Sequence, residues 1–467
     1  MCKQGWKWML PILLGCASCS KVGSVQGNAP TELPLPERIQ VVFNHRDGAR
    51  YRSPLSDQWR NGDNLEKFVI TAIEQAQQEI LVAVQELSLP GVAEALVTAK
   101  QRGVTVQMVI ENSFSQPWGD LHEADLSLHE RRRVANLKML ADRNNDGKLS
   151  PTERYRGDAM QILRRHQIPL IDDREDGSKG SGLMHHKFLV IDNQTVITGS
   201  ANFSNSGMHG DPAAMQTRGN VNHLLSFNST ELAELFKKEF LLMWGDGAGG
   251  AKDSLFGLAK NEPGIQTAKV GDTRIEVFFA PHAKRQKMNG LKFITKQIET
   301  SKQNIDMALF IFSAQGLVNK LREQVQSGVK VRLIADPGFA SRSYSEVLDL
   351  LGLALPDHRC KIEAGNNPFD SPLKGVGTPR LASGDKLHHK FAVIDNKKVI
   401  TGSFNWSPAA AHTNDETLLL IHSPQLAKHF TREMNRMWRG AELGITARMQ
   451  RKLDRQRARC GSGQERG

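Results

Sequence analysis

Two short segments of the sequence carry nearly the same reactive side chains. Residues 185–200 read HHKFLVIDNQTVITGS, and residues 388–403 read HHKFAVIDNKKVITGS. In each segment a histidine and a lysine are two residues apart, so on a β-strand both side chains point to the same face. An imidazole can act as nucleophile, acid or base near neutral pH, and an ammonium group can hold a phosphate. The pattern therefore indicates phosphoryl chemistry.

Each segment ends in further groups that suit a phosphate. Ser200 and Ser403 offer hydroxyl groups, and Asn202 and Asn405 offer side-chain amides two residues later. Hydroxyl and amide groups donate hydrogen bonds to phosphate oxygens. We expect these four residues to bind the substrate.

The second histidine of each pair, His186 or His389, points to the opposite face of its strand. We expect these two histidines to be structural. Zinc binding by the paired histidines is an alternative, but the accompanying lysines and phosphate-binding groups argue against it.

The two segments belong to a duplicated chain. The sequence RIQVVF at 38–43 recurs as RIEVFF at 274–279. From residue 68 on, matching residues are 225 positions apart before the motif, 203 apart at the motif and 194 apart at the end. The first copy therefore carries two insertions, of 22 and 9 residues.

Strand and helix patterns alternate within each copy, which predicts a parallel-rich sheet covered by helices. The expected fold class is α/β, with two duplicated α/β sandwich domains related by a pseudo-twofold axis. The expected divisions are a signal peptide with a lipobox (1–19), a tether (20–36), a first domain (37–246), a linker (247–272), a second domain (273–445) and a basic tail (446–467).

The motif spacing resembles the signature of the phospholipase D superfamily: His-x-Lys, four residues, Asp, six residues, Gly-Ser-x-Asn. Both copies fit it, over a resemblance that covers roughly residues 36–445. The matching residues are His185, Lys187, Asp192, Gly199, Ser200 and Asn202 in the first copy, and His388, Lys390, Asp395, Gly402, Ser403 and Asn405 in the second.

The resemblance implies a mechanism in one pocket built by both halves. One histidine attacks phosphorus and forms a phosphohistidine, while the other protonates the leaving oxygen and then activates water. By resemblance, His185 is the nucleophile and His388 the acid and base. Lys187 and Lys390 hold the phosphoryl charge, and Asp192 and Asp395 complete the predicted catalytic set. No metal or other cofactor is expected for catalysis.

The family also places a carboxylate downstream that orients a catalytic histidine. Glu416 fits this position in the second copy, and Asn222 is its counterpart in the first. We therefore expect Glu416 to support the second copy and Asn222 the first. An amide cannot stabilise an imidazolium as a carboxylate does, so the two histidines should differ in pKa.

The first insertion contains a second motif, DRNNDGKLSPTE at 142–153. It fits the EF-hand calcium loop D-x-[DN]-x-[DN]-G-x5-E. The predicted ligands are Asp142, Asn144, Asp146, Lys148 through its carbonyl group, Ser150 and Glu153. The alternative is an ordinary turn followed by a helix capping box at Ser150 and Glu153. Because the site is single, we expect a structural calcium ion rather than a sensor.

The N-terminus resembles an export signal. Lys3 and Lys7 precede the short apolar stretch Trp8–Leu14. The sequence at its end is Leu13-Leu14-Gly15-Cys16. This ending resembles a bacterial lipoprotein box, so we expect lipidation at Cys16. An exported protein of the periplasm or cell envelope is predicted. A plain signal peptide is the alternative.

Five cysteines do not imply a disulfide framework, and the sequence gives little support for a bridge between Cys360 and Cys460. No apolar run approaches the roughly 20 residues of a membrane-spanning helix.

The net charge of +11 favours an anionic partner. The leading hypothesis is a monomeric phosphoric diester hydrolase of the phospholipase D type that acts on phospholipid and meets the membrane through its lipid anchor. A nuclease acting on nucleic acid is one alternative, although an aromatic content of 6% provides few stacking surfaces for bases. A calcium-dependent anion-binding surface protein without turnover is another.

Overall fold

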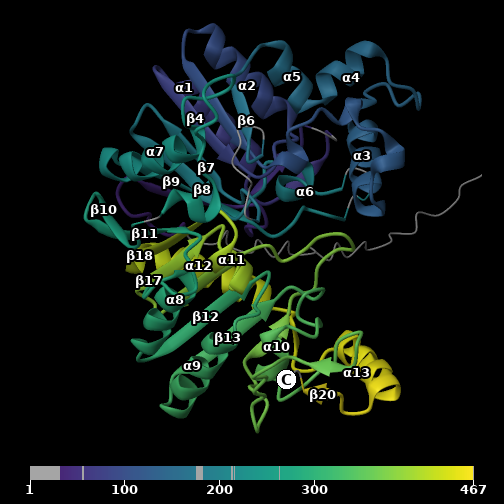
Figure 1. Ribbon diagram of the computed structural model, residues 1–467, viewed down its shortest axis with the longest axis vertical. Helices are drawn as coiled ribbons and strands as arrows, with labels where there is room; N and C mark the ends of the chain where they lie inside the picture. The colour runs from purple at the N-terminus through teal and green to yellow at the C-terminus, as the bar shows by residue number, and fades with distance from the viewer. Residues whose placement is uncertain are drawn as a thin grey trace, which may run out of the picture. The chain divides into compact units, whose positions relative to one another are not determined.

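The computed structural model describes residues 32–54, 57–174, 182–211, 214, 216–261 and 263–465. Within Leu33–Gly467 the chain forms two large β-sheets, one from each sequence copy, with helices on their faces (Figure 1). The predicted lipidation site Cys16 lies outside the described residues. None of the helices in the described ranges is both long and apolar enough to cross a bilayer.

The first sheet has seven strands in the order β1-β9-β8-β7-β4-β5-β6. They are β1 (Ile39–Phe43), β4 (Glu79–Val84), β5 (Thr105–Ile110), β6 (Leu170–Asp172), β7 (Lys187–Ile191), β8 (Thr195–Gly199) and β9 (His223–Asn228). β4 is parallel to β5 but antiparallel to β7, and β7, β8, β9 and β1 are antiparallel in turn. The expectation of a parallel-rich sheet was wrong, because the motif folds as a β7–β8 hairpin and tight turns join only antiparallel strands.

The second sheet repeats this arrangement and adds a strand at each edge. Its order is β10-β11-β18-β17-β16-β12-β13-β15-β19. The strands are β10 (Gln266–Val270), β11 (Thr273–Ala280), β12 (Asn304–Leu309), β13 (Lys330–Ala335), β15 (Val376–Thr378), β16 (Lys390–Ile394), β17 (Lys398–Gly402), β18 (Glu416–His422) and β19 (Glu442–Leu443). β16 and β17 are the second motif hairpin, at the same place in the sheet as β7 and β8.

The remaining strands form two small two-stranded sheets. β2 (Arg50–Arg52) pairs with β3 (Trp59–Asn61), and β14 (Lys361–Ile362) pairs with β20 (Gln464–Glu465). The segment expected to be a linker thus supplies β10 to the second sheet, and the expected tail contributes both a helix and a strand.

Thirteen α-helices lie in the described ranges. They are α1 (Leu65–Gln75), α2 (Pro90–Gln101), α3 (Leu128–Ala141), α4 (Pro151–Gly157), α5 (Ala159–Arg165), α6 (Asn205–Met208), α7 (Thr230–Trp244), α8 (Gly290–Glu299), α9 (Gln315–Gln326), α10 (Glu346–Leu350), α11 (Pro408–His412), α12 (Pro424–Trp438) and α13 (Ala447–Cys460). Equivalent helices start in the same way. Asn64 and Asn289 cap α1 and α8, and Ser229 and Ser423 cap α7 and α12, each by accepting a backbone N–H.

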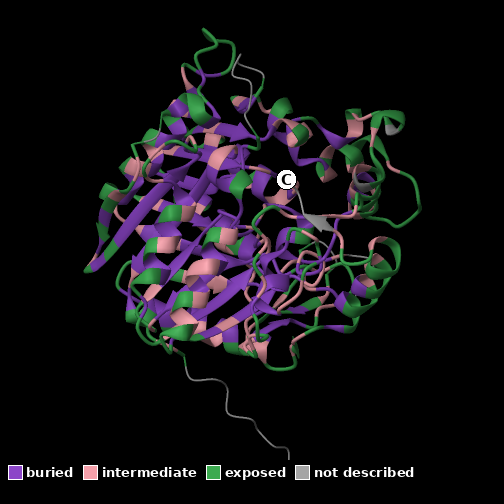
Figure 2. Cartoon of the chain, turned by 60° about the horizontal axis from the view of Figure 1, so that its bottom comes forward, coloured by how far each residue is buried: buried purple, intermediate pink, exposed green. Residues whose placement is uncertain are grey.

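The largest hydrophobic core is shared by both halves. It joins Phe188 and Phe236 of the first half to Phe279, Phe391 and Phe430 of the second, all fully buried or nearly so. Figure 2 shows the strands almost wholly buried and the outward faces of the helices exposed. Because α7 and α12 both contribute to this core, burial of apolar surface holds the two sheets together.

A disulfide bond ties the last helix to the second half. Cys460, at the end of α13, is bonded to Cys360, 100 residues earlier. Sequence analysis offered little support for this bond. Met449 and Leu453 of α13 are buried against the same half, so the helix is attached along its length.

Candidate active site

The two motifs meet because the residues just before each motif strand pair with a residue of the other half. The residues before β7 pair with Asp415, and those before β16 pair with Val221. The backbone N–H of His185 donates to the carbonyl group of Asp415 at 3.0 Å, and the N–H of His388 donates to the carbonyl group of Val221 at 3.1 Å. Short parallel bridges join Met184 to Asp415 and Val221 to Leu387. These symmetric exchanges bring the start of each motif strand to the interface between the sheets.

The carboxylate of Glu416 therefore supports the histidine of the other half. Nδ1 of His185 lies 2.7 Å from Oε2 of Glu416, and both side chains are buried. The expectation that Glu416 supports its own half was wrong. Asp415, the residue before β18, pairs with Met184 of the first half, and this pairing places Glu416 beside the first motif. The hydroxyl of Ser403 and the amide of Asn414 donate to the same carboxylate, at 2.6 and 3.2 Å.

Asn222 occupies the equivalent position beside His388. Nδ1 of His388 lies 3.0 Å from both Oδ1 of Asn222 and the carbonyl oxygen of Ser200. A carbonyl oxygen can only accept, so Nδ1 of His388 must carry the proton. A neutral His388 then has its lone pair on Nε2.

The two serines hold these supporting groups in place. The hydroxyl of Ser200 donates to Asn222 at 2.8 Å, as that of Ser403 does to Glu416. Both serines are fully buried. Their hydroxyl protons are therefore committed within the protein, in contrast to the expected donation to a phosphate.

Asn202 and Asn405 differ from the serines. Their side-chain oxygens are buried and have no hydrogen-bond partner among the described residues. An amide oxygen only accepts, so the N–H groups of these side chains are the candidate donors to a substrate.

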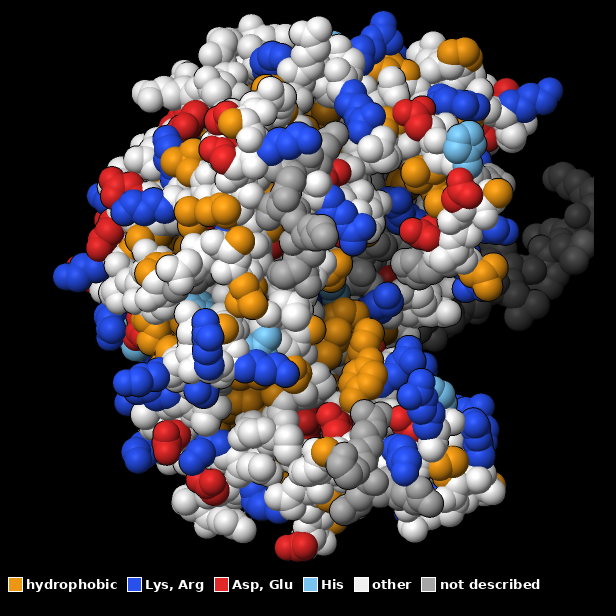
Figure 3. All heavy atoms as spheres, viewed as in Figure 1, with side chains coloured by type: hydrophobic (Ala, Val, Ile, Leu, Met, Phe, Trp, Pro, Cys, Tyr) orange, Lys and Arg blue, Asp and Glu red, His pale blue; other side chains and the backbone are white. Residues whose placement is uncertain are grey.

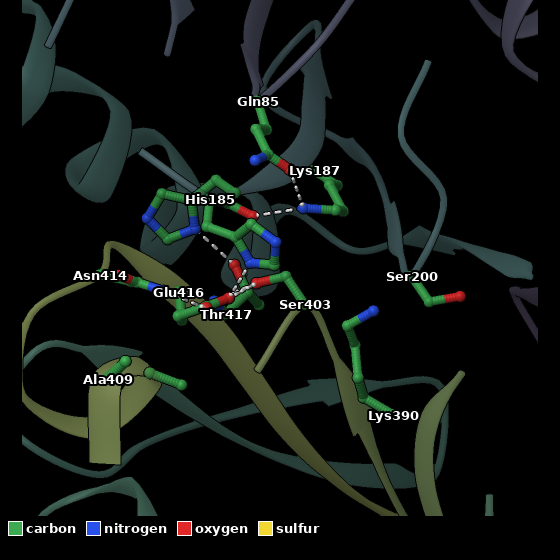
Figure 4. A network of polar contacts seen from close by, with 12 residues as sticks. Gln85, His185, Lys187, Ser200, Lys390, Ser403, Ala409, Asn414, Glu416 and Thr417 are labelled. Carbon is green, nitrogen blue, oxygen red and sulfur yellow. Dashed lines mark hydrogen bonds and ion pairs between the residues drawn. The ribbon is translucent and has the colours of Figure 1, made fainter. Parts of the chain in front are cut away.

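The two lysines contribute buried ammonium groups from opposite halves. Lys187 Nζ donates to the carbonyl oxygen of His185 and Lys390 Nζ to that of His388, each at 2.7 Å. Figure 4 shows both lysine side chains extending toward the same space between the halves, with Glu416 and Ser403 beside it. Two buried amines that a bound anion can keep protonated create a site for that anion.

Burial shifts the pKa values of these groups strongly. It lowers the pKa of Lys187 to about 7, even though Glu416 and Glu86 lie close enough to oppose the shift. It also lowers the pKa of Lys390 well below its usual range, and the Lys187 cation adds to this effect. Conversely, burial raises the pKa of Glu416 to about 7. The empty site therefore carries less charge than its residue types suggest.

The two candidate catalytic histidines are neutral in the empty site at pH 7. Burial is the main cause that lowers the pKa of His185, and Lys187 and Lys390 lower it further. The pKa of His388 falls through burial and then through Lys390, Lys187 and His185. Because each imidazole responds to charges from the opposite half, the groups of both motifs act on one site.

Asp192 and Asp395 lie away from this space, at the far ends of β7 and β16. Each carboxylate accepts three backbone N–H groups in its own half: residues 77–79 for Asp192 and residues 302–304 for Asp395. Their predicted place in the catalytic set finds no support in this geometry. They fix the hairpin turns that position the motif strands.

The second histidines of the motifs form matching buried contacts. His186 Nε2 lies 2.8 Å from Glu239 of α7, and His389 Nε2 lies 3.1 Å from Glu433 of α12. Lys260 contacts Glu239 and also pairs with Asp415 at 2.9 Å, next to Glu416. These contacts are consistent with the structural role expected for His186 and His389.

Sequence reasoning missed one pair of residues beside the lysines. The Gln85 side-chain oxygen accepts from Lys187 at 3.3 Å, whereas Lys390 lies 5.1 Å from the ring centre of Phe310. Phe310 also packs against His388, with ring centres 4.6 Å apart. The constant spacing of 225 residues pairs Gln85 with Phe310 and could have identified both positions. One wall of the site is thus polar and the other aromatic.

The predicted calcium loop lies between α3 and α4. Asp142 accepts from the N–H groups of Asp146 and Gly147, and Glu153 accepts from those of Arg143, Asn144 and Ser150. Lys148 donates its N–H to Asp146. The capping box of Ser150 and Glu153, weighed as the alternative, is present. No three His, Cys, Asp or Glu side chains within the described ranges are arranged as a metal site.

Two copies of one α/β unit that meet at paired His-x-Lys motifs define a duplicated PLD-like protein. A family model described as "Cardiolipin synthase, PLD-like domain" matches residues 69–244 and 294–438. The chain belongs to this family.

The individual relatives are distant. A mitochondrial cardiolipin hydrolase of Xenopus tropicalis is 28% identical over 140 residues, which cover 30% of this chain and 56% of that protein. A phospholipase D of Rickettsia typhi is 29% identical over 167 residues, covering 34% and 72%. The crystal structure of a phosphatidylserine synthase of Haemophilus influenzae Rd KW20 covers 88% of both chains with a TM-score of 0.53 and 13% identity. That likeness confirms the fold class.

The protein should take up protons when inorganic phosphate binds to this site. At pH 8 Lys187, with a pKa of about 7, is mostly neutral in the empty protein, and a bound anion raises the pKa values of both lysines and both histidines. The contribution of Lys187 to this proton uptake becomes smaller as the pH falls below 7, because Lys187 is then already protonated before phosphate binds. Calorimetric titration at pH 8 in two buffers of different ionisation enthalpy measures the uptake. Equal binding heats in both buffers would contradict this electrostatic description.

Proposed function

We propose that the chain hydrolyses phosphodiesters through a phosphohistidine intermediate, with His185 as nucleophile and His388 as acid and base. The observation that carries the proposal is the exchange of supporting groups at the interface. His185 is supported by the carboxylate of Glu416, and His388 by the neutral amide of Asn222. The two imidazoles are thus chemically different although their motifs are nearly identical.

In the first step Nε2 of His185 attacks phosphorus, and the bond from phosphorus to the leaving oxygen breaks. Positive charge develops on the His185 ring as the P–N bond forms, and Glu416 stabilises it through Nδ1. Nε2 of His388 gives its proton to the leaving oxygen. The amide of Asn222 stabilises an imidazolium less than a carboxylate would, so protonated His388 is the stronger acid.

In the second step His388 accepts a proton from water, and that water attacks phosphorus. The P–N bond breaks, and His185 is restored. Lys187 and Lys390 hold the phosphoryl oxygens in both steps, with the amides of Asn202 and Asn405 as further donors. Since His388 is neutral in the empty site, the anionic substrate itself raises its pKa and recruits the proton that the leaving group needs.

Phospholipid is the proposed substrate class. The named activities of cardiolipin hydrolase and phospholipase D relatives support it. A nuclease remains the second candidate, because the net charge of +11 also suits nucleic acid. The aromatic wall at Phe310 fits a lipid better than a base, since His388 and Lys390 already contact that ring.

We also propose that the protein works outside the cytoplasm and is lipid-anchored at Cys16. The disulfide between Cys360 and Cys460 supports an oxidising compartment.

Calcium binding at 142–153 remains a proposal as well. The residue types suit calcium. The backbone N–H of Asp146 donates to the side-chain oxygens of Asp142 and Asn144, which brings these two predicted ligands together. α3 precedes this loop directly and carries Arg133, which lies 3.8 Å from Glu86 near Lys187. A calcium ion there would stabilise the insertion that carries Arg133 and take no part in the chemical steps.

The substrate proposal predicts head-group release from phosphatidylcholine or cardiolipin. His185→Ala should lower the rate of head-group release at least about a thousandfold, because the nucleophile is removed. His166→Ala is the matched control, since this half-buried histidine contacts Tyr155 outside the site. Cleavage of single-stranded DNA without lipid turnover would contradict phospholipid as the substrate. Absence of turnover on all three substrates would favour the anion-binding alternative.

The calcium proposal predicts that added calcium raises the melting temperature of the full chain and that Glu153→Gln abolishes this rise. Glu130→Gln is a closely matched control, because Glu130 forms the same capping box with Ser127 at the start of α3. If Glu153→Gln leaves both calcium titration and melting temperature unchanged, the loop does not bind calcium. Equal effects of the two variants would instead identify a helix-capping role.

A further inference from the structure

Helix α13 carries an unusual concentration of uncompensated positive charge. Its fourteen residues include six cations, Arg448, Arg451, Lys452, Arg455, Arg457 and Arg459, but only one acid, Asp454. Within the described ranges none of these cations forms an ion pair. Figure 3 shows Lys and Arg side chains gathered at the lower right, where Figure 1 places α13. The helix lies beyond residues 69–244 and 294–438, which match the family model.

The helix presents these charges in a fixed orientation. Met449 and Leu453, four residues apart, are buried against the second half, and Cys460 bonds to Cys360 at the helix end. The opposite stripe of Arg448, Arg451 and Arg455 is exposed. Because the apolar stripe and the disulfide hold α13, its basic stripe must face outward.

A chain of contacts leads from the candidate active site to this helix. Phe310 packs against His388 and, with ring centres 4.5 Å apart, against Phe339. Arg342 lies over the ring of Phe339. The carbonyl group of the neighbouring Ser341 accepts from Lys452 of α13 at 2.6 Å.

The cations at the end of this chain lie close enough to affect one another. Partial burial, and then Arg342, Arg448 and Arg455, lower the pKa of Lys452, and no acid opposes them. The fold holds these like charges together, so a bound anion would relieve their repulsion.

Exposed apolar side chains lie next to the helix in sequence and close to Arg342, which acts on Lys452. Leu443 and Ile445, directly before α13, are 48% and 41% exposed, and Tyr344, two residues after Arg342, is 42% exposed. Cations beside exposed apolar and aromatic side chains are typical of surfaces that dock on anionic bilayers. A single strand of nucleic acid stacks successive bases on several aromatic faces, whereas Tyr344 is a single exposed ring and Phe310 and Phe339 already contact His388, Lys390 and Arg342.

We propose that α13, with Leu443, Ile445 and the Arg342–Tyr344 loop, docks the protein on an anionic lipid surface beside the active site. We call these residues the α13 surface. The proposal rests on phospholipid as the substrate class and adds how the protein meets it. The cations would contact lipid phosphates, and the apolar side chains would enter the head-group region. A second, sequence-distant attachment would then supplement any anchor at the N-terminus.

Flotation with vesicles tests this docking in the full chain carrying Cys16→Ser and His185→Ala. These substitutions remove a lipid anchor and turnover, so the result does not depend on the enzymatic proposal. We expect binding to phosphatidylcholine vesicles that contain phosphatidylglycerol and little binding to pure phosphatidylcholine. Adding Arg448→Glu and Arg451→Glu should weaken binding at least about tenfold, because two cations that attract the anionic lipid are replaced by two anions that it repels.

The control pair is Lys292→Glu and Lys296→Glu on α8, which changes the net charge equally at two exposed positions. It should weaken vesicle binding much less. Ile445→Ser should weaken the binding that persists at high salt, where the charges are screened. Melting temperatures establish that each variant is folded.

Equal losses from the α8 and α13 pairs would overturn the proposal, since only net charge would then matter. So would equal binding to neutral and anionic vesicles. Single-stranded DNA that binds more tightly than the vesicles, and loses binding through the α13 pair alone, would reassign the α13 surface to nucleic acid.

Discussion

The pairing of His185 with Glu416 across the two halves is the interaction on which the site depends. It requires the backbone exchange in which residues 183–185 pair with Asp415 and residues 386–388 pair with Val221. That exchange requires both halves to be held together by their shared core. Neither half contains a complete site, because each histidine takes its supporting group from the other half. Duplication within one chain therefore supplies a lasting interface as well as a second motif.

The same arrangement explains how two almost identical motifs can have different chemistry. The strands, lysines and serines are symmetric, but the groups that support the two histidines differ: the carboxylate of Glu416 in one case and the amide of Asn222 in the other. Burial amplifies this difference, because a carboxylate and an amide interact with an imidazolium most unequally where water is excluded. Burial also lowers the pKa values of His185 and Lys187, so these groups bind protons less readily before a substrate is present. In the proposed mechanism, substrate binding and the supply of the catalytic proton are thus linked.

Much of the fold and the site was predictable from local sequence, while the exchange between halves was not. Constant spacings revealed the duplication, and the strand period predicted correctly that His185 and Lys187 share a face. Periodicity could not show that the β7–β8 hairpin makes the sheet mixed. The partner of Glu416 depends on how two domains dock, which no local pattern encodes. Asp192 matched the signature, yet its carboxylate holds a turn through three backbone N–H groups. Cys360 and Cys460 are too far apart in sequence for their bond to be inferred.

The most direct test of the two-histidine mechanism is rapid mixing with bis(p-nitrophenyl) phosphate, whose leaving group needs little protonation. With His388→Gln, we expect a burst of one p-nitrophenolate per chain, followed by stalling, because His185 still attacks but no base activates water. Mass spectrometry should then find the adduct on the peptide that contains His185. With His185→Gln, no burst is expected. A burst and an adduct on His388 in the His185→Gln protein would reverse the assignment of nucleophile and acid and contradict the role given to Glu416.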